Sequence, residues 1–90
     1  MKYKPVYAEQ AARNLDKLPR NISKRIVLKI RFYCEQSNPF AYAEKLAQPA
    51  LGQYRFRIGE YRAIFDIDKQ GNINVLFILA IRHRKDIYRK

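Results

Sequence analysis

The sequence has very few of the residues that build metal sites and disulfide bonds. Its 90 residues include one cysteine, Cys34, one histidine, His83, and no tryptophan. One cysteine cannot form an internal disulfide, and one cysteine with one histidine cannot supply an ordinary set of zinc ligands. We therefore expect neither a disulfide nor a metal cofactor. We expect Cys34 to be a buried helix residue in a protein of the reducing cytoplasm.

Long apolar runs and acidic residues are scarce as well. No stretch approaches the ~20 apolar residues that cross a bilayer, and the basic N-terminus is not followed by the apolar run of a secretion signal. We therefore expect a soluble protein with no membrane segment. Only 8 acidic residues stand against 19 lysines and arginines, which gives a formal net charge of +11. Such a surface attracts polyanions, whether nucleic acid, an anionic membrane or an acidic protein.

Apolar residues are nevertheless frequent enough for a folded core. They make up 48% of the chain, and only three residues are glycine, which excludes a disordered or collagen-like sequence. A chain of this length holds one compact domain. We expect a single domain that spans residues 1–90.

The first half of the chain has the residue spacing of two helices. Apolar residues recur every three or four positions over residues 8–18, where Pro19 ends the pattern, and again over residues 21–36, where Asn21 is the expected N-cap. The apolar stripe of the second helix consists of Ile22, Ile26, Ile30 and Tyr33, widened by Val27 and Cys34. Basic residues on its other face are either solvated or in contact with a phosphate backbone, and they are Lys24, Arg25, Lys29 and Arg31.

Proline residues mark two further segments of this half. Residues 2–7 mix aromatic, β-branched and basic side chains around Pro5. This pattern favours a strand at the edge of a sheet, because proline cannot donate a hydrogen bond to a central ladder. After Pro39, a short helical turn is expected over residues 39–46.

Beyond Gly52 the spacing of apolar residues changes from helical to alternating, as expected for strands. The sequence predicts strands over residues 54–58, 61–67 and 73–81. The last of these is apolar on both faces and is therefore expected inside the sheet. Together with the helices, these strands predict an α+β fold in which two N-terminal helices pack on an antiparallel sheet.

Two glycine-containing turns set the expected strand register. Gly59-Glu60 fits a two-residue type II′ loop, which pairs Ile58 with Tyr61 and Arg57 with Arg62. A three-residue loop with Gly71 in the left-handed conformation pairs Ile67 with Ile73, Phe65 with Val75 and Ala63 with Phe77. The sheet face expected to take the helices carries Tyr54, Phe56, Ile58, Tyr61, Ala63, Phe65, Val75, Phe77 and Leu79.

The opposite face of the predicted sheet gathers arginines. Arg57 lies directly opposite Arg62, and Arg55 lies two residues along on the same face. Alternation along the last strand places Arg82 on this same face, together with Leu76, Ile78 and Ala80. Like charges that face each other across a ladder destabilise it, so replacing Arg62 should leave the fold intact or slightly more stable.

Carboxylates are too few near these arginines to neutralise them. Only Asp66 and Asp68 lie close, at the far end of the face, so an external anion is the expected partner of the guanidinium groups. The sequence therefore predicts an anion-binding site on this face of the sheet.

Proton transfer at such a site needs another kind of residue, because arginine does not release its proton. Histidine is the side-chain type that titrates near neutrality, and His83 is the only one. Alternation along an extended strand points His83 to the helix face and Arg82 to the arginines. Asp86 either orients His83 or pairs with a basic neighbour. Tyr88 is either an apolar anchor or a hydroxyl and ring presented to a nucleotide.

Three stretches of the sequence resemble a known family. Lys45-Leu46, the stretch from Leu51 to Phe65 and the stretch from Arg82 to Tyr88 are similar to the RelE/ParE toxin superfamily of bacterial type II toxin–antitoxin systems. The resemblance covers nearly the whole chain in the family's order. It implies a microbial RNase-like fold with a small twisted antiparallel sheet flanked by helices, and a cognate antitoxin protein encoded beside the toxin.

The superfamily has two branches, which share the fold and differ in activity. Resemblance to the RelE-type branch implies an mRNA interferase, an endoribonuclease that acts on mRNA in the A site of the 70S ribosome, next to 16S rRNA. The alternatives are a ParE-like inhibitor of DNA gyrase without nuclease activity, or a toxin-fold protein that is only a binding module. Residues that match the RelE-type site are Arg55, Arg57, Arg62, Arg82 and Tyr88.

The expected reaction is attack of a ribose 2′-hydroxyl on the adjacent phosphate, without a metal, to give a 2′,3′-cyclic phosphate and a 5′-hydroxyl. Arg57 and Arg62 would stabilise the phosphorane, while Arg55 and Arg82 would position the RNA backbone. Tyr88 or His83 would handle protons or stack on a base. RNA-binding contacts are also expected from Arg84 and Lys85. The basic pair is arginine where the nuclease branch often has lysine, which leaves the general base open.

Overall fold

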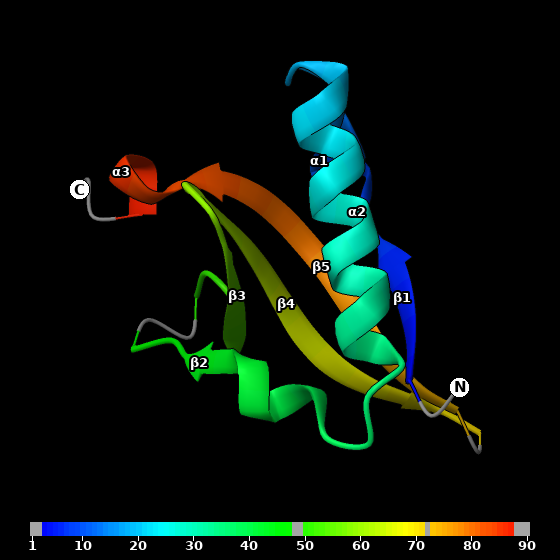
Figure 1. Ribbon diagram of the computed structural model, residues 1–90. Coiled ribbons are helices and arrows are strands. Elements are labelled where there is room, and N and C mark those ends of the chain that lie inside the picture. The colour runs from blue at the N-terminus through cyan, green and yellow to red at the C-terminus, as the bar shows by residue number, and fades with distance from the viewer. Residues whose placement is uncertain (1–2, 48–49, 72, 88–90) are drawn as a thin grey trace.

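The computed structural model describes residues 3–47, 50–71 and 73–87 (Figure 1). Its elements are β1 (Tyr3–Tyr7), α1 (Glu9–Asp16), α2 (Arg20–Cys34), the 3₁₀ helix η1 (Pro39–Tyr42), β2 (Ala43–Lys45), β3 (Tyr54–Ile58), β4 (Tyr61–Gln70), β5 (Ile73–His83) and α3 (Arg84–Ile87). The predicted α+β fold is confirmed. In the described part of the chain, no helix is long and apolar enough to cross a membrane.

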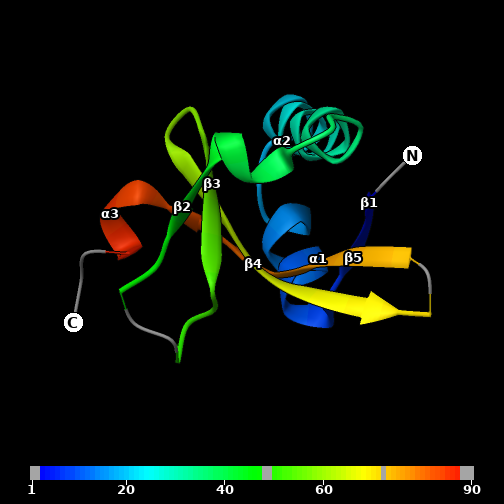
Figure 2. The same ribbon diagram turned by 90° about the horizontal axis from the view of Figure 1, so that it is seen from below.

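The sheet has five strands in the order β1-β5-β4-β3-β2. β1 lies at an edge, as Pro5 indicated, and runs parallel to β5, whereas the other neighbours are antiparallel. α1 continues along the edge of β5 beyond β1: the Ala8 amide donates to the Ile78 carbonyl at 2.8 Å and the Ile81 amide donates to Asn14 Oδ1 at 3.0 Å. α2 lies on one side of the sheet only (Figure 2).

The helix-covered face holds the core. Phe56 and Phe65 from neighbouring strands are fully buried and stack with ring centroids 4.3 Å apart. Tyr33 of α2 adds its ring 4.7 Å from that of Phe56. Ile26 and Ile30 of α2 complete this packing, since the period of an α-helix brings both to one side. Cys34 is buried in the same core, as predicted.

The second helix starts differently from the prediction. The N-cap of α2 is Pro19 and not Asn21, and the Pro19 carbonyl accepts hydrogen bonds from the amides of Ile22 and Ser23 at 3.0 Å. Proline fits here because it fixes the chain direction at a position whose own amide has no helical partner. Val27 does not widen the buried stripe, since it is 37% exposed.

The segment predicted as one helical turn over residues 39–46 contains two elements. Its first part is helical, and Asn38 Oδ1 caps it by accepting from the Phe40 amide at 3.2 Å. Residues 43–45 instead form β2, which pairs with β3 and places Glu44 opposite Arg55. Residues 43–45 form a strand and not a helical turn because they pair with backbone groups of β3 that would otherwise have no partner.

The β3–β4 hairpin has the predicted register, with Ile58 opposite Tyr61 and Arg57 opposite Arg62. Gly59 has a φ of 61°, and no described residue other than glycine has a positive φ, which fits the type II′ loop.

The β4–β5 register differs from the prediction. β4 extends to Gln70, which faces Ile73, so Gly71 lies in a two-residue loop, and Ile67 pairs with Leu76 rather than with Ile73. A β-bulge between Ile64 and Phe65 then shifts the partner strand by one residue, because Ile64 faces Ala80 while Phe65 faces Ile78.

The bulge has a direct effect on which residues reach the core. Leu76 and Ile78, predicted on the arginine side, are 0% exposed and belong to the core. Val75 and Phe77, predicted in the core, face Asp68 and Asp66 on the other side. The side chains of Ala80 and Arg82 lie beyond the bulge and keep the predicted face.

Candidate functional site

Three arginines lie in one row across the sheet. Arg57 faces Arg62, and Arg62 faces Arg82, so β3, β4 and β5 contribute one guanidinium each. Directly opposed residues of antiparallel strands share a face, and here it is the face away from α2. With Arg55, which lies two residues before Arg57, these residues form what we call the arginine face. The structure thus brings together the four sheet arginines that the sequence predicted to lie on one face.

Arg62 is the buried member of this row. It is 4% exposed, and its Nη1 atom donates to the carbonyl oxygens of Gly59 at 3.0 Å and Tyr61 at 2.9 Å. The side chain therefore ties the β3–β4 turn to the strand that follows it. Arg57 and Arg82 are exposed and are the members of the row that can reach a ligand directly.

Glu44 places a carboxylate among the arginines. Its Oε1 atom lies 3.2 Å from Arg55 Nε and 3.8 Å from Arg57 Nε, and its side chain is 45% exposed. The expectation that only Asp66 and Asp68 lie near these arginines is therefore wrong, because the sequence predicts a helical turn where residues 43–45 form β2. Ala43, Glu44 and Lys45 show no alternation of apolar and polar residues, and three residues are too few to distinguish a strand from a turn.

The loop before β3 covers the lower part of the arginine face. Gly52 approaches the sheet so closely that a Cβ atom on it would lie 2.6 Å from Ile64 Cγ2, and its φ is +149°. The Gln53 amide donates to Asp66 Oδ1 at 2.8 Å, and Gln53 Oε1 accepts from the Ile67 amide at 2.9 Å. The carboxylate of Asp66 is thus hydrogen-bonded to this loop, and the loop covers the end of the arginine face at Asp66.

The C-terminal residues divide between the two faces. His83 faces Tyr61 across the ladder, with a T-shaped ring contact at 5.3 Å, so it lies on the side away from Arg82 as alternation predicted. Its Nδ1 atom accepts a hydrogen bond from the Lys85 amide at 3.2 Å. The predicted site residue Tyr88 lies outside the described residues. The structure therefore does not bring His83 together with the arginine row.

Arg84 is held at the β3–β4 turn. Its amide donates to the Glu60 carbonyl at 2.7 Å, and its Nε atom lies 2.5 Å from Glu60 Oε2. Lys85 and Asp86 are exposed on α3. These contacts fix the start of α3 against the hairpin, next to the end of the arginine row.

Comparisons with known proteins point to one family. The model of the family described as "ParE toxin of type II toxin-antitoxin system, parDE" matches residues 6–88. No curated protein sequence matches the chain.

Solved structures agree with this assignment. The toxin-antitoxin complex RelBE2 from Mycobacterium tuberculosis has a chain with 27% identity and a TM-score of 0.72, covering 93% of this chain and 100% of that one. The RelB-RelE antitoxin-toxin complex from Methanococcus jannaschii gives 26% identity and a TM-score of 0.58, with 92% and 94% covered. The fold is also that of the YoeB/ParE toxin from Agrobacterium tumefaciens, at 20% identity, a TM-score of 0.68 and coverage of 89% and 97%. The chain therefore belongs to the ParE toxin family of type II toxin–antitoxin systems, within the RelE/ParE superfamily.

Proposed function

We propose that this toxin is a ribosome-dependent endoribonuclease that cleaves mRNA in the A site of the 70S ribosome, next to 16S rRNA. One observation carries the proposal: the row of Arg57, Arg62 and Arg82 lies on the sheet face that α2 leaves uncovered, with Glu44 beside it. A fixed cluster of positive charge with an adjacent carboxylate is suited to phosphodiester chemistry by charge stabilisation and proton transfer.

The arginines divide the work according to their exposure. Arg57 and Arg82 are open to solvent, so their guanidinium groups can bind phosphate oxygens and stabilise the negative charge of the phosphorane. Arg62 acts as a positioning residue, since its side chain holds the turn that follows Arg57. Arg55 orients Glu44 through their ion pair. Arg84 and Lys85 lie at the edge of the face as RNA-binding residues.

Glu44 is the carboxylate that contacts the arginines of this face and can accept a proton beside them. In the proposed reaction, Glu44 takes the proton of the ribose 2′-hydroxyl while the 2′ oxygen forms its bond to phosphorus. The bond from phosphorus to the 5′ oxygen then breaks, and that oxygen takes up a proton, for which Tyr88 is the predicted donor. The products are a 2′,3′-cyclic phosphate and a 5′-hydroxyl.

The test is single-turnover cleavage of mRNA on programmed 70S ribosomes, mapped by primer extension. Glu44→Gln should slow cleavage by roughly 10²-fold or more, the usual effect of losing an acid–base group. Glu35→Gln is the matched control, because Glu35 pairs with Arg31 on α2 at 3.8 Å, away from the arginine face. A Glu44→Gln rate within about threefold of the wild-type rate would remove the carboxylate from the mechanism. Intact mRNA with the wild-type toxin would reject the nuclease proposal itself.

The match to the ParE toxin family supports a second candidate, a ParE-like inhibitor of DNA gyrase. Induction of the toxin distinguishes the two activities. Loss of translated mRNA with intact DNA supports the nuclease, whereas double-strand breaks and an SOS response with intact mRNA support the gyrase inhibitor.

A cognate antitoxin is part of either function. Two of the similar solved structures are toxin–antitoxin complexes. With a net charge of +11, this toxin should bind an antitoxin whose contacting segment is acidic. Co-expression with the small protein encoded beside the toxin gene should restore growth and yield a stable complex.

A further inference from the structure

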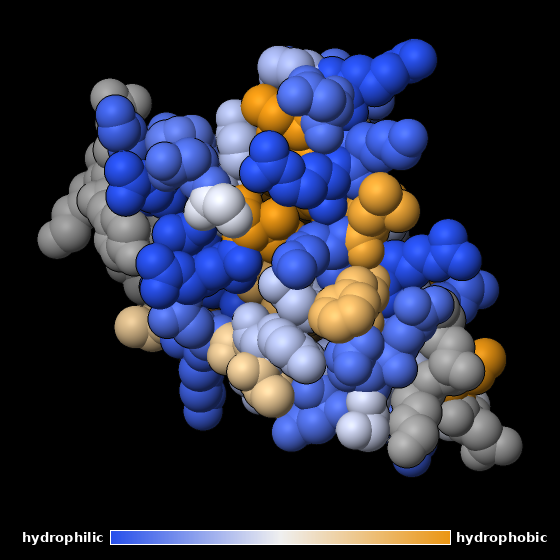
Figure 3. Space-filling view, in the orientation of Figure 1, coloured by the Kyte–Doolittle hydropathy of each residue, from blue (hydrophilic) through white to orange (hydrophobic). Residues whose placement is uncertain are grey.

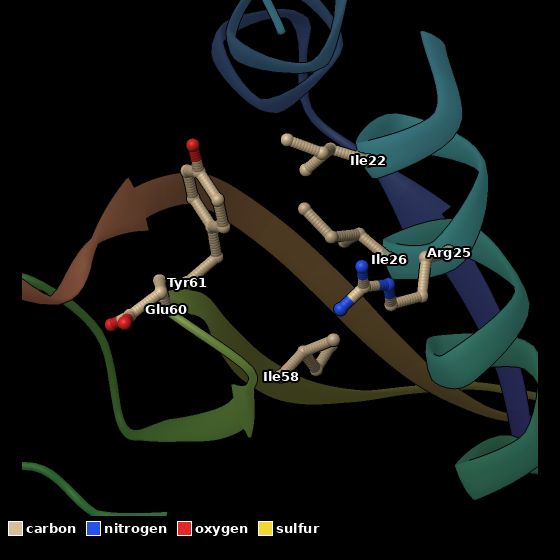
Figure 4. A pocket seen from close by; sticks show the side chains of 6 residues that line it. All are labelled: Ile22, Arg25, Ile26, Ile58, Glu60 and Tyr61. Atoms are coloured by element: carbon tan, nitrogen blue, oxygen red, sulfur yellow. The ribbon is translucent and has the colours of Figure 1, made fainter. Parts of the chain in front are cut away.

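A small cavity opens between α2 and the β3–β4 turn, on the sheet face away from the arginines. Its volume is about 120 Å³, and it is lined by Ile22, Arg25, Ile26, Ile58, Glu60 and Tyr61 (Figure 4). From the same side, the space-filling view shows a hollow with apolar atoms at its floor and hydrophilic residues around it (Figure 3).

The size and lining of the cavity indicate what it can hold. Ile26 and Ile58 form a floor that is 1% and 4% exposed, while Ile22 and Tyr61 are half-buried at its sides. Cavities that take nucleotides or other small ligands are usually about 300–1,000 Å³. A volume of about 120 Å³ with aliphatic walls instead fits one bulky aliphatic side chain from another protein.

Arg25 supplies a charge at the rim. Its guanidinium reaches from α2 over the hairpin turn, where a Cβ atom on Gly59 would lie 3.6 Å from Arg25 Nη1. Among the residues that the structure describes, no carboxylate lies within ion-pair distance of Arg25. An acidic residue of a partner can therefore pair with Arg25 while a neighbouring apolar side chain enters the cavity.

Charge identifies the kind of partner. A second copy of this chain would bring another +11 charges to a chain that already carries +11, so self-association is opposed by repulsion. Glu60, the acidic residue of the lining, is already paired with Arg84, which leaves Arg25 as the charge that a partner can meet. An acidic protein segment has the complementary charge. If that segment is a helix, an acidic residue and an aliphatic residue three or four positions apart lie side by side and can reach Arg25 and the cavity together.

We propose that this cavity is the anchor point for a helix of the antitoxin. The helix inserts one leucine-sized side chain between Ile22 and Tyr61 and pairs an acidic residue, three or four positions away, with Arg25. The identity of the partner rests on the function proposed above. Because the cavity and the arginine face lie on opposite sides of the sheet, this helix fixes the antitoxin without touching the arginines, and another segment must cover them.

The test is calorimetric titration of the purified toxin with the small acidic protein encoded beside its gene. Ile22→Trp fills the cavity and should weaken binding at least about 30-fold, the range of a lost interface anchor. Leu28→Trp is the matched control, because Leu28 lies on the same helix, is 52% exposed and does not line the cavity; it should bind like the wild type. Arg25→Glu, which changes an exposed residue, should weaken binding about tenfold or more.

Wild-type affinity in both Ile22→Trp and Arg25→Glu would overturn the anchor. If Ile22→Trp does not fold, Arg25→Glu alone decides, with an acid-to-lysine change in the partner expected to restore binding. Absence of any binding by the wild type would overturn the assigned partner. mRNA cleavage by the unbound toxin is measured in parallel, so a failure of the nuclease proposal is seen separately from a failure of docking.

Discussion

The two faces of the sheet hold their residues in place in different ways. On the helix-covered face, Phe56, Phe65 and Ile78 are 0% exposed and are fixed by packing. On the arginine face, Arg57 is exposed and is positioned by one carboxylate and by its neighbours on the ladder. Phe56 and Arg57 are adjacent in β3, so a single strand serves both purposes. The packed face carries the stability that lets the other face keep like charges side by side.

Substitutions of two adjacent residues in β3 should distinguish the packed face, which contributes stability, from the arginine face, which contributes activity. Phe56→Ala should lower the free energy of unfolding by about 3–5 kcal/mol, because it empties a fully buried aromatic site. Arg57→Ala should change it by about 0.5 kcal/mol or less while abolishing mRNA cleavage. Urea denaturation and the cleavage assay measure both. Comparable losses of stability in the two variants would contradict the division between the faces.

The packed face should also make stability depend on alkaline pH. Burial raises the pKa of the Cys34 thiol from 9.0 to about 11 and, with Cys34 nearby, that of the Tyr7 hydroxyl from 10.0 to about 12. The unfolded thiol ionises near pH 9, whereas the folded thiol keeps its proton, so stability is full below pH 9 and falls as pH rises toward 11. The loss due to Cys34 should approach about 3 kcal/mol.

Unfolding of the wild type and of Cys34→Ala, followed at pH 8 and at pH 10.5, measures this effect. The variant should lose the part of the slope that begins near pH 9 and keep the part due to Tyr7, which begins near pH 10. Equal slopes in both proteins would show that the thiol does not contribute.

Arg62 differs from the other arginines of this face because it is buried. Replacing it tests whether its hydrogen bonds stabilise the fold more than its repulsion from Arg57 destabilises it. Arg62→Met should cost about 2 kcal/mol, because it removes two hydrogen bonds, those to the turn carbonyls of Gly59 and Tyr61. This reverses the expectation from charge repulsion alone. Arg57→Met is the control from the exposed end of the same pair. An Arg62→Met protein as stable as the wild type would show that repulsion offsets both hydrogen bonds.

The smallest effect is expected for the ion pair at the start of α3. The side chains of Arg84 and Glu60 are 52% and 59% exposed, so their coupling should be below about 1 kcal/mol and should decrease with salt. A double-mutant cycle with Glu60→Gln and Arg84→Gln measures it. A coupling of several kcal/mol would mean that surface charges hold this corner as firmly as packing holds the core.

Sequence alone predicted the elements whose pattern is long or whose turn is specific. The helices, the β3–β4 hairpin and the opposition of Arg57 to Arg62 followed from periodicity and from Gly59. The second hairpin was misjudged because the polar residues over 68–70 resemble a turn, although they form the end of β4. Where no helix covers the sheet, both faces of a strand can be polar. The composition of residues 68–70 therefore does not distinguish a strand from a loop.

Half of the candidate site depended on features with no sequence signature. Glu44 reached the arginines because a three-residue strand paired with β3, and that pairing is decided by the free sheet edge. Arg62 was predicted on the correct face, but its burial depends on the neighbouring backbone carbonyls. Arg82 lies on the predicted face although the predicted register is wrong along the whole hairpin. Above the bulge the error is four residues, since Ala63 faces Ile81 and not Phe77, and an even shift keeps each residue on its face.

The bulge in β5 acts as a change of phase within one strand. Residues with even numbers up to Ile78 point to the core, whereas from Ala80 onward even-numbered residues point away from it and Ile81 enters the core. A strand has only two phases, so one extra residue suffices to switch between them. Deleting Leu79 would remove this extra residue and leave one uninterrupted alternation, in which Ile78 still points to the core and Arg82 still points away from it. Both faces should therefore survive the deletion, and toxicity should be kept. Loss of toxicity in a folded deletion variant would show that the bulge itself positions Arg82.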